Sequence, residues 1–420
     1  MEQFDKHFLM DMETIQVYAK MKLNLFAPDE PLICQDLGDG NINYVYRLKS
    51  AQTGKSYILK HADTRTRSKA SEVSLDRIRI EAEALMMEGE LAPGFVPEVY
   101  YFDITMGCIV MQDLYDYENL RTALCNRKQF PKLADDITTF MAQTLIRSTD
   151  LVIPPEQKRE MIRRFINPSL CAITERKVFN DPFSNFSGRN KPFELVAEFL
   201  EHELYEDDAL RLEAAKLKEI FKNSAQALIH GDLHTGSIMV RQDSTMVLDP
   251  EFAFYGPIGY DVGNVIANLI FAWISAYVDM DLGEERDAYL KYLADTITVI
   301  PDLFREKALK IIYSESTEHM TEAAGVPEWY LDDVLTDTAG FAALELIRRI
   351  IGSAKVKGIT EIRDKQRRAF AEKFCIRLAK DIIFNRGTRY HSGDSYTQAM
   401  QYFLDVDDHA FITSRYLHAT

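Results

Sequence analysis

The sequence predicts an α+β fold in two parts: a small β-rich part that ends near residue 115, and a larger, mainly helical part beyond it. Short apolar runs bounded by turn residues recur through the first part, as in strands. After Gln112-Asp113-Leu114 most of the chain has a helical pattern, broken by short strands around an acidic motif. The chain has 420 residues, of which 46% are hydrophobic, so both parts can build packed cores.

The first part is predicted to begin with a helix, which strands then follow. A helical pattern over 11–23 precedes apolar runs of strand length over 32–34, 44–48, 56–60, 96–102 and 108–111. Residues 51–55 form a predicted turn, and 76–90 form a helix rich in Glu, Arg and Leu. We therefore expect a lobe in residues 1–115 with one sheet and a helix inserted between its strands.

The second predicted lobe, residues 116–420, contains a hairpin and a long apolar helix. Residues 237–240 and 245–248 read as strands joined by the polar turn 241–244. Val262–Val278 has no charged residue, but it is shorter than a comfortable membrane span. We expect a helix buried in this lobe and no membrane partner.

The acidic motif is the most informative part of the chain. Asp232 lies within His230-Gly231-Asp232-Leu233-His234, and Asp249-Pro250-Glu251 follows the hairpin. The hairpin would bring Asp232 and the Asp249/Glu251 pair to the same end of a small sheet. A carboxylate that meets a hydroxyl, beside two that hold Mg²⁺, forms the catalytic half of a phosphoryl-transfer site. The alternative, three solvated acids on a surface loop, does not explain this combination and spacing.

A second set of residues could bind phosphates. Gly38, Gly40 and Asn41 lie in a loop between two predicted strands, where glycine lets backbone amides approach an anion. Lys60 ends the third strand and would face the phosphates, held by Glu81 or Glu83, of which we favour Glu81. Taken singly, the loop could be only a turn and the lysine a solvated edge residue. Their order along the chain is that of a two-lobed kinase.

Two adjacent arginines, Arg348 and Arg349, lie in the apolar helical stretch 341–351. Neighbouring helix residues point about 100° apart, so both cannot line one solvated face. A buried arginine needs a partner, either a phosphate or a carboxylate such as Glu345. We expect the pair to contact the transferred phosphoryl group or the acceptor, with a structural salt bridge as the alternative.

These motifs resemble the protein-kinase-like superfamily of small-molecule kinases that includes aminoglycoside and choline kinases, and within it the 5-methylthioribose kinase family. The resemblance is carried by the segments 230–238, 249–261 and 346–352 and covers nearly the whole chain. It implies a two-lobed protein-kinase-like fold with ATP between the lobes. One departure is Ser237, which stands where the wider superfamily has a metal-binding asparagine, so the number of Mg²⁺ ions stays open.

The resemblance implies the reaction and the remaining site residues. Asp232 would deprotonate the 1-hydroxyl of 5-methylthioribose, a sugar of methionine salvage, while Asp249 and Glu251 hold Mg²⁺. Gln112, Asp113 and Leu114 would form the hinge that meets adenine, Asn43 would contact the acceptor, and Asp261 would brace the catalytic loop. His234 is expected to be structural. The alternatives are a kinase for another small alcohol, such as an aminoglycoside, choline or homoserine, and a nucleotide-binding pseudokinase.

Charge and cysteine content restrict partners and compartment. The formal net charge of −16 argues against a nucleic-acid partner, because phosphate backbones attract basic surfaces. The five cysteines are scattered, without zinc or redox spacing, as in a reducing cytoplasm. The first residues lack the basic start and apolar core of a signal peptide, so we expect a cytoplasmic enzyme. A homodimer is implied by the resemblance alone.

Overall fold

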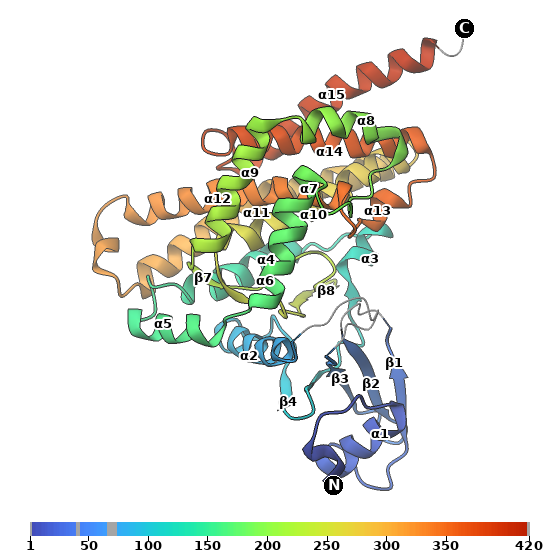
Figure 1. The fold of residues 1–420 in the computed structure, drawn as a ribbon, viewed down its shortest axis with the longest axis vertical. Helices are drawn as coiled ribbons and strands as arrows, with labels where there is room; N and C mark the ends of the chain where they lie inside the picture. Colours follow the sequence, from blue (N-terminus) through green and yellow to red (C-terminus); the bar gives the residue numbers. More distant parts are fainter. Residues whose placement is uncertain (1, 39–42, 65–73, 418–420) are drawn as a thin grey trace. The chain divides into compact units, whose positions relative to one another are not determined.

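The computed structural model describes residues 2–38, 43–64 and 74–417, and this part of the chain divides into two compact units (Figure 1). Unit 1 comprises Met1–Tyr117, Asn167–Leu170 and Met246–Ala253. Unit 2 comprises Glu118–Ile166, Cys171–Thr245 and Phe254–Thr420. The segment with Asp249 and Glu251, which the sequence analysis placed in the larger part, therefore belongs to unit 1. One reason is a backbone bond of 2.7 Å from the Val247 amide to the Phe95 carbonyl.

Unit 1 is built on a five-stranded antiparallel sheet in the order β1-β2-β3-β5-β4. The strands are β1 (Leu32–Asp36), β2 (Tyr44–Ser50), β3 (Ser56–His61), β4 (Val99–Asp103) and β5 (Cys108–Gln112). The helices are the 3-10 turn η1 (Glu2–Asp5), α1 (Met12–Val17), the π-helical turn η2 (Tyr18–Lys22) and α2 (Asp76–Leu91). The predicted strands and both predicted helices of the first part are confirmed.

One face of this sheet packs in the core of unit 1, and the other face carries a charged residue of the candidate site. Alternate residues of a strand point to opposite faces. Leu59 of β3 is fully buried in a core shared with Leu48 of β2, Val110 of β5 and Tyr18 of η2. The next residue, Lys60, therefore projects from the other face, which places its ammonium on the same side as α2. Lys60 can therefore interact with charged groups, although its neighbour in the strand, Leu59, lies in the core.

Unit 2 is mainly helical (Figure 1). Its longer helices are α4 (Leu133–Met141), α5 (Pro155–Arg164), α9 (Asp208–Asn223), α10 (Ile258–Asp279), α11 (Glu284–Glu315), α12 (Val326–Ile351), α14 (Lys365–Asn385) and α15 (Gly393–Leu417). Shorter helical segments are α3 (Leu120–Cys125), η3 (Ala142–Ile146), α6 (Pro168–Thr174), η4 (Glu175–Asn180), α7 (Asp181–Ser184), η5 (Glu194–Val196), α8 (Ala197–Leu200), η6 (Glu201–Tyr205), η7 (His319–Glu322) and α13 (Lys357–Thr360). The first three residues of α6 belong to unit 1.

Short strands frame the acidic motif. They are β6 (Glu118–Asn119), β7 (Ala227–Ile229), β8 (Ile238–Arg241), β9 (Ser244–Val247) and β10 (Phe254–Gly256). β7 pairs with β10, and β6, β8 and β9 form a three-stranded sheet. The predicted hairpin is confirmed, with its turn between β8 and β9. The last two residues of β9 belong to unit 1.

Two helices at the centre of unit 2 approach closely because α10 carries glycine at the crossing. A Cβ on Gly259 would lie 2.5 Å from the Thr338 backbone nitrogen of α12, and one on Gly263 would lie 2.7 Å from the Ala342 nitrogen. Glycine is required there because no side chain fits between the backbones. The contact fixes α12, which carries both arginines, against α10, which follows the acidic motif.

The apolar segment predicted as a buried helix is part of α10. Among the described residues it is the one helix long and apolar enough to cross a membrane, and 89% of its most apolar window is buried inside the protein. That burial is typical of a core helix. The α+β fold, a sheet-containing small unit and a mainly helical large one, is confirmed.

Candidate active site

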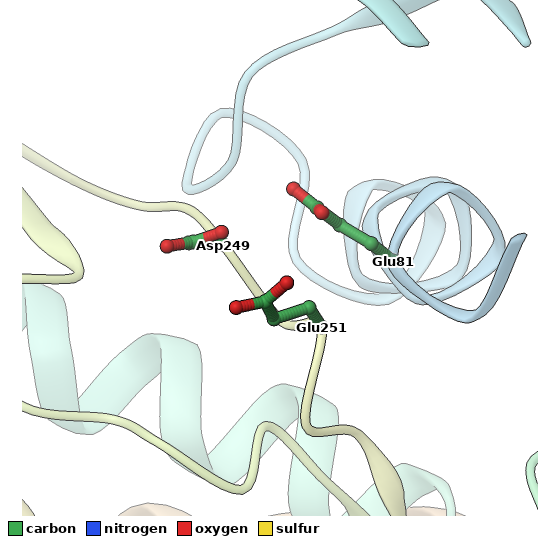
Figure 2. A group of neighbouring side chains, drawn as sticks. All are labelled: Glu81, Asp249 and Glu251. Atoms are coloured by element: carbon green, nitrogen blue, oxygen red, sulfur yellow. The ribbon is translucent and has the colours of Figure 1, made fainter. Parts of the chain in front are cut away.

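Three carboxylates converge in unit 1 (Figure 2). Glu81 comes from α2, while Asp249 and Glu251 come from the segment after β9. One oxygen of each lies within 4.8 Å of the others, a spacing at which they could hold a metal ion. Asp249 has φ of +75°, a left-handed conformation that is uncommon for a residue with a side chain. Such backbone geometry often occurs where a side chain must be aimed at a site.

Lys60 lies among these carboxylates. Its Nζ is 2.6 Å from Glu81 Oε1 and also donates a hydrogen bond to Asp249. Glu83, the other glutamate considered from the sequence, instead pairs with Arg79 at 2.7 Å. The predicted Lys60–Glu81 pair is therefore confirmed, while the contact of Lys60 with ATP phosphates stays a prediction.

Glu251 is held by two residues from elsewhere in unit 1. Asn43 Nδ2 donates to Glu251 Oε2 at 2.9 Å, and Arg77 Nη2 donates to Asn43 Oδ1 at 2.8 Å. Arg77 is only 2% exposed, and its Nε lies 3.9 Å from Glu251 Oε2. Asn43 was predicted to bind the acceptor; its described contacts position Glu251, and the acceptor role stays a prediction. The sequence analysis missed Arg77, although its position four residues before Glu81 puts both on one helix face.

Negative charge exceeds positive charge in this cluster. Burial raises the pKa of Glu251, and the nearby Asp249 carboxylate raises it further, against the opposing effect of Lys60. Burial likewise raises the pKa of Glu81, whose Oε2 is buried without a hydrogen-bond partner in the described part of the chain. The cluster therefore favours an added cation, and its all-oxygen donor set suits Mg²⁺.

The predicted phosphate loop is described only in part. Gly38 has φ of +72°, a conformation open to glycine, and its amide donates to Asp36 Oδ1 at 2.9 Å. Gly40 and Asn41 lie outside the described residues. The phosphate contact of all three stays a prediction.

The predicted hinge residues make contacts within unit 1. The Gln112 amide donates to the Glu98 carbonyl at 2.9 Å, and the Leu114 carbonyl accepts from the Tyr117 amide at 3.1 Å. Asp113 accepts from Arg47 Nε at 2.8 Å. These bonds order the segment, and its contact with adenine stays a prediction.

In unit 2, the loop that carries Asp232 is anchored at both sides. The amides of His230 and Gly231 donate to the Asp261 carboxylate at 2.6 and 3.0 Å, which confirms the predicted bracing role of Asp261. Ser237 Oγ donates to the Asp232 carbonyl at 3.0 Å and closes the turn. Because α10 carries Asp261, the glycine-mediated packing of α10 on α12 also places this loop near the two arginines.

The Asp232 carboxylate lies between cationic and polar groups. Its Oδ1 is 3.6 Å from Arg348 Nη2, and its Oδ2 is 3.4 Å from His234 Nε2. Burial opposes ionisation, but His234, Arg348 and Arg349 together hold the pKa of Asp232 well below its usual range. The low pKa keeps the carboxylate ionised, and because the side chain remains 29% exposed it is accessible to a ligand. Whether Asp232 and the unit 1 carboxylates act together stays a prediction.

His234 supports this arrangement without carrying charge. Burial, together with Arg349 and Arg121, lowers the pKa of His234 to about 4 against the opposing effect of Asp232. Its Nδ1 accepts from the Gly236 amide at 3.0 Å, which fits the expected structural role. Arg121 Nη2 lies 3.2 Å from His234 Nε2. Arg121 was missed because it is a single basic residue in the short helix α3, with nothing in its neighbourhood to mark it.

Arg348 and Arg349 are both buried, at 9% and 8% exposure, and share one carboxylate. Arg349 Nε donates to Glu345 Oε1 at 2.8 Å, and Arg348 Nε donates to Glu345 Oε2. The structural salt bridge considered from the sequence is therefore present. This salt bridge does not exclude the predicted contact with the phosphoryl group or the acceptor, because Arg348 also lies next to Asp232. Glu345 orients the guanidinium groups toward the loop.

Comparison with known proteins agrees with these features. Residues 33–296 match the model of the phosphotransferase enzyme family. Methylthioribose kinase of Geobacillus sp. (strain WCH70) is 38% identical over 88% of this chain and 90% of its own length. The enzyme of the same name from Bacillus pumilus (strain SAFR-032) is 34% identical over 93% of this chain and 96% of its own. Plasmodium vivax ethanolamine kinase aligns with 97% of this chain and 91% of its own at 14% identity and a TM-score of 0.46. The chain belongs to the methylthioribose kinase family of the phosphotransferase enzymes.

Proposed function

We propose that this enzyme transfers the γ-phosphoryl group of ATP to the 1-hydroxyl of 5-methylthioribose, giving 5-methylthioribose 1-phosphate and ADP in methionine salvage. The observation that carries the reaction type is Asp232, an accessible carboxylate kept ionised by Arg348 and Arg349. The acceptor is supported by the names of relatives that align over most of the chain.

In this proposal Asp232 accepts a hydrogen bond from the 1-hydroxyl and aims its oxygen at the γ-phosphorus. A bond forms between the sugar oxygen and phosphorus, the bond from phosphorus to the β,γ-bridging oxygen breaks, and ADP leaves. The hydroxyl proton passes to Asp232. Because the pKa of Asp232 is low, the carboxylate is a weak base before transfer, and its main contribution is orientation until the oxygen has begun to bond.

The arginines would stabilise negative charge on the phosphoryl group. Arg348 lies beside Asp232, so the charge that develops near the reacting oxygen falls within reach of a fixed guanidinium. Preorganised positive groups of this kind lower barriers because they need no reorganisation during the reaction. Glu345 holds both arginines in place.

In unit 1, Asp249 and Glu251 would hold Mg²⁺, and Lys60 would bind phosphate oxygens. Asp249 and Glu251 would hold the Mg²⁺ ion, which would supply positive charge to offset that of the triphosphate. Lys60 is kept in position by Glu81, and Glu251 by Asn43 and Arg77. The proposal requires these residues and Asp232 to act on one ATP molecule.

The test is an ADP-release assay with Mg-ATP and a panel of 5-methylthioribose, ribose, choline, homoserine and kanamycin. We expect turnover with 5-methylthioribose at the lowest concentrations. Turnover of another member alone would keep the kinase chemistry and replace the acceptor. ATP binding without turnover of any member would favour a pseudokinase.

We also propose a cytoplasmic homodimer. The dimer is supported by the family resemblance alone, and the compartment by the scattered, unpaired cysteines. Light scattering coupled to size exclusion would distinguish a dimer from the 48.3 kDa monomer.

A further inference from the structure

The loop that carries Asp232 is joined to the start of α3. The Arg121 amide donates to the Thr235 carbonyl at 3.0 Å, and Asn119 Nδ2 donates to the Gly236 carbonyl at 2.7 Å. Asn119 also caps α3, because its Oδ1 accepts from the Arg121 amide at 3.2 Å. These contacts hold Arg121 beside the loop independently of its own side chain.

The guanidinium group of Arg121 lies in a space that Gly236 leaves open. A Cβ on Gly236 would overlap Arg121 Nη2 and would lie 2.7 Å from His234 Cε1. Arg121 Nη2 is 3.2 Å from His234 Nε2 and 3.4 Å from His234 Nδ1. Within the described part of the chain, Arg121 forms no ion pair with an acid. Because a half-buried cation without such a partner is costly, the position of Arg121 requires another explanation.

The contacts of the His234 ring determine which of its nitrogens carries the proton. Nδ1 accepts from the Gly236 amide at 3.0 Å, so a proton on Nδ1 would break that bond. A neutral imidazole has one proton, which must then be on Nε2. With its proton there, Nε2 cannot accept from Arg121. The guanidinium therefore acts on the ring as an adjacent positive charge.

The proton on Nε2 lies beside the carboxylate of Asp232. Asp232 Oδ2 is 3.4 Å from His234 Nε2, while Asp232 Oδ1 is 3.6 Å from Arg348 Nη2. Contacts of this length are common in the absence of substrate and tighten when the reactants bind. One carboxylate oxygen therefore faces a neutral donor and the other faces a cation. Protonation of the ring would remove the Gly236 bond that orients the donor.

The charged groups around the ring decide whether it stays neutral. Arg121 faces it from α3, Arg349 and Glu345 face it from α12, and Asp232 lies on the same loop. Burial and the two arginines oppose protonation, whereas the two carboxylates favour it. Because Arg121 touches the ring, its charge strongly disfavours a second positive charge there.

We propose that Arg121 is a positioning residue of the phosphoryl-transfer site, which keeps the His234 ring neutral so that its Nε2 proton holds Oδ2 of Asp232. The inference rests on the proposed function and adds the group that fixes the orientation of Asp232. In the reaction the hydroxyl proton passes to Asp232 and stops there. It is not relayed to His234, because Nε2 already carries a proton and Nδ1 is occupied by the Gly236 amide.

The first test is nitrogen-15 NMR of the full-length enzyme with labelled histidine, recorded from pH 3.5 to 8.5. The chain has nine histidines, and the spectrum of His234→Gln identifies the signal of interest. The wild-type ring should carry its proton on Nε2. In Arg121→Met the pKa of His234 should rise by about one pH unit, whereas Arg121→Lys should keep the wild-type titration. A proton on Nδ1, or the same titration in Arg121→Met as in the wild type, would overturn the proposal.

The second test asks whether Arg121 acts through His234. The pH profile of kcat/KM for 5-methylthioribose is measured in the wild type, Arg121→Met, His234→Gln and the double variant. The acid limb of Arg121→Met should move to higher pH and coincide with its NMR titration, while the rate at pH 8 stays within about threefold of the wild type. When His234 is already replaced, Arg121→Met should change kcat/KM less than about twofold from pH 6 to 8. Equal losses in both backgrounds would reject the positioning role.

A third variant displaces the guanidinium without removing it. The methyl group introduced by Gly236→Ala would occupy the place of Arg121 Nη2, which is the end of a flexible side chain and can move away. The pKa of His234 should rise in this variant too. The control is Arg286→Met, which removes a buried guanidinium that contacts Tyr277 and should leave the His234 titration unchanged. A shift of equal size in the control would show a general loosening of the fold and would overturn the proposal.

The NMR test separates this inference from the proposed function, because it requires no turnover. Absence of turnover in the wild type would reject the proposed function, and with it the positioning role of Arg121, even if the ring titrates as expected. Turnover combined with an unchanged His234 titration in Arg121→Met would reject the role of Arg121 alone.

Discussion

Both units contain a cluster with candidate site carboxylates, but the surroundings shift the pKa values of these carboxylates in opposite directions. In unit 1, burial and the repulsion among Glu81, Asp249 and Glu251 raise the pKa of Glu251. In unit 2, positive neighbours outweigh burial and keep the pKa of Asp232 low. The same chemical group, a carboxyl, is therefore suited to a cation site in unit 1, whereas in unit 2 it stays ionised and is suited to accept a hydrogen bond from a hydroxyl group.

The difference shows that charge balance, more than burial, assigns the roles. Lys60 and Arg77 only partly compensate the negative charge of the three acids of unit 1, so that cluster is suited to hold a divalent cation. Around Asp232 and Glu345 of unit 2 the cations are in excess, so that cluster tolerates added negative charge. A kinase needs both environments, one for the metal and one for the group that becomes charged during transfer.

The most direct way to break this comparison is Asp232→Asn. Asparagine keeps the shape of the side chain but removes its negative charge. The kcat should therefore fall about 1,000-fold or more, which is within the range for the loss of a general base. ATP affinity should stay within a few-fold. Turnover is measured by ADP release and ATP affinity by calorimetry, with the exposed Asp208→Asn as control. Unchanged turnover would remove Asp232 from the base role.

The next largest effect is expected for Arg348→Met, which removes the cation next to Asp232. Turnover should fall about 100-fold, as for the loss of one preorganised donor. The pKa of Asp232 should rise, and because the ionised form is lost as pH falls through that pKa, the acid limb of kcat/KM should move to higher pH. The profile is recorded from pH 3 to 8.5, so that it reaches the range in which a carboxyl group titrates, with Arg211→Met as the surface control. An acid limb at the wild-type position would contradict the electrostatic account.

The substitution Asp249→Asn tests the proposed metal site of unit 1. Removal of one proposed ligand should raise the Mg²⁺ concentration for half-maximal activity at least tenfold, while saturating Mg²⁺ restores part of the rate. A Mg²⁺ titration at fixed ATP measures this, with Asp243→Asn, an exposed acid of the β8–β9 turn, as control. The same half-saturation in the variant and the wild type would place the metal elsewhere.

The smallest expected effect concerns stability in EDTA. The pKa of Glu251 is raised in the folded state, so its contribution to stability is present below its ordinary value of 4.5 and is lost as pH rises through the folded value. Gln does not titrate, so Glu251→Gln should gain stability relative to the wild type from pH 5 to 9, by on the order of 1 kcal/mol. Urea unfolding measures the difference, with Glu219→Gln as an exposed control. A difference that stays constant with pH would show that Glu251 is not electrostatically strained.

Local patterns predicted much of the fold and part of the site. The strands of unit 1, the buried helix α10 and the hairpin β8–β9 follow from periodicities of 2 and 3.6 residues, which depend on near neighbours only. The Lys60–Glu81 pair and the brace at Asp261 were expected because each lies in a recognisable motif. Arg77 and Arg121 were not expected, since their immediate sequence does not distinguish a buried polar residue with a distant partner from an ordinary surface residue.

The sequence by itself determined the fold class, the order of the elements and the candidate carboxylates and arginines of the proposed chemistry. Only the tertiary structure decided the partners: Asn43 meets Glu251 across 208 positions of chain, and Arg348 meets Asp232 across more than a hundred. It also assigned Met246–Ala253 to unit 1. The physical reason is that a pKa or an unsatisfied hydrogen bond depends on every group within a few ångströms, and packing brings those groups together from distant segments.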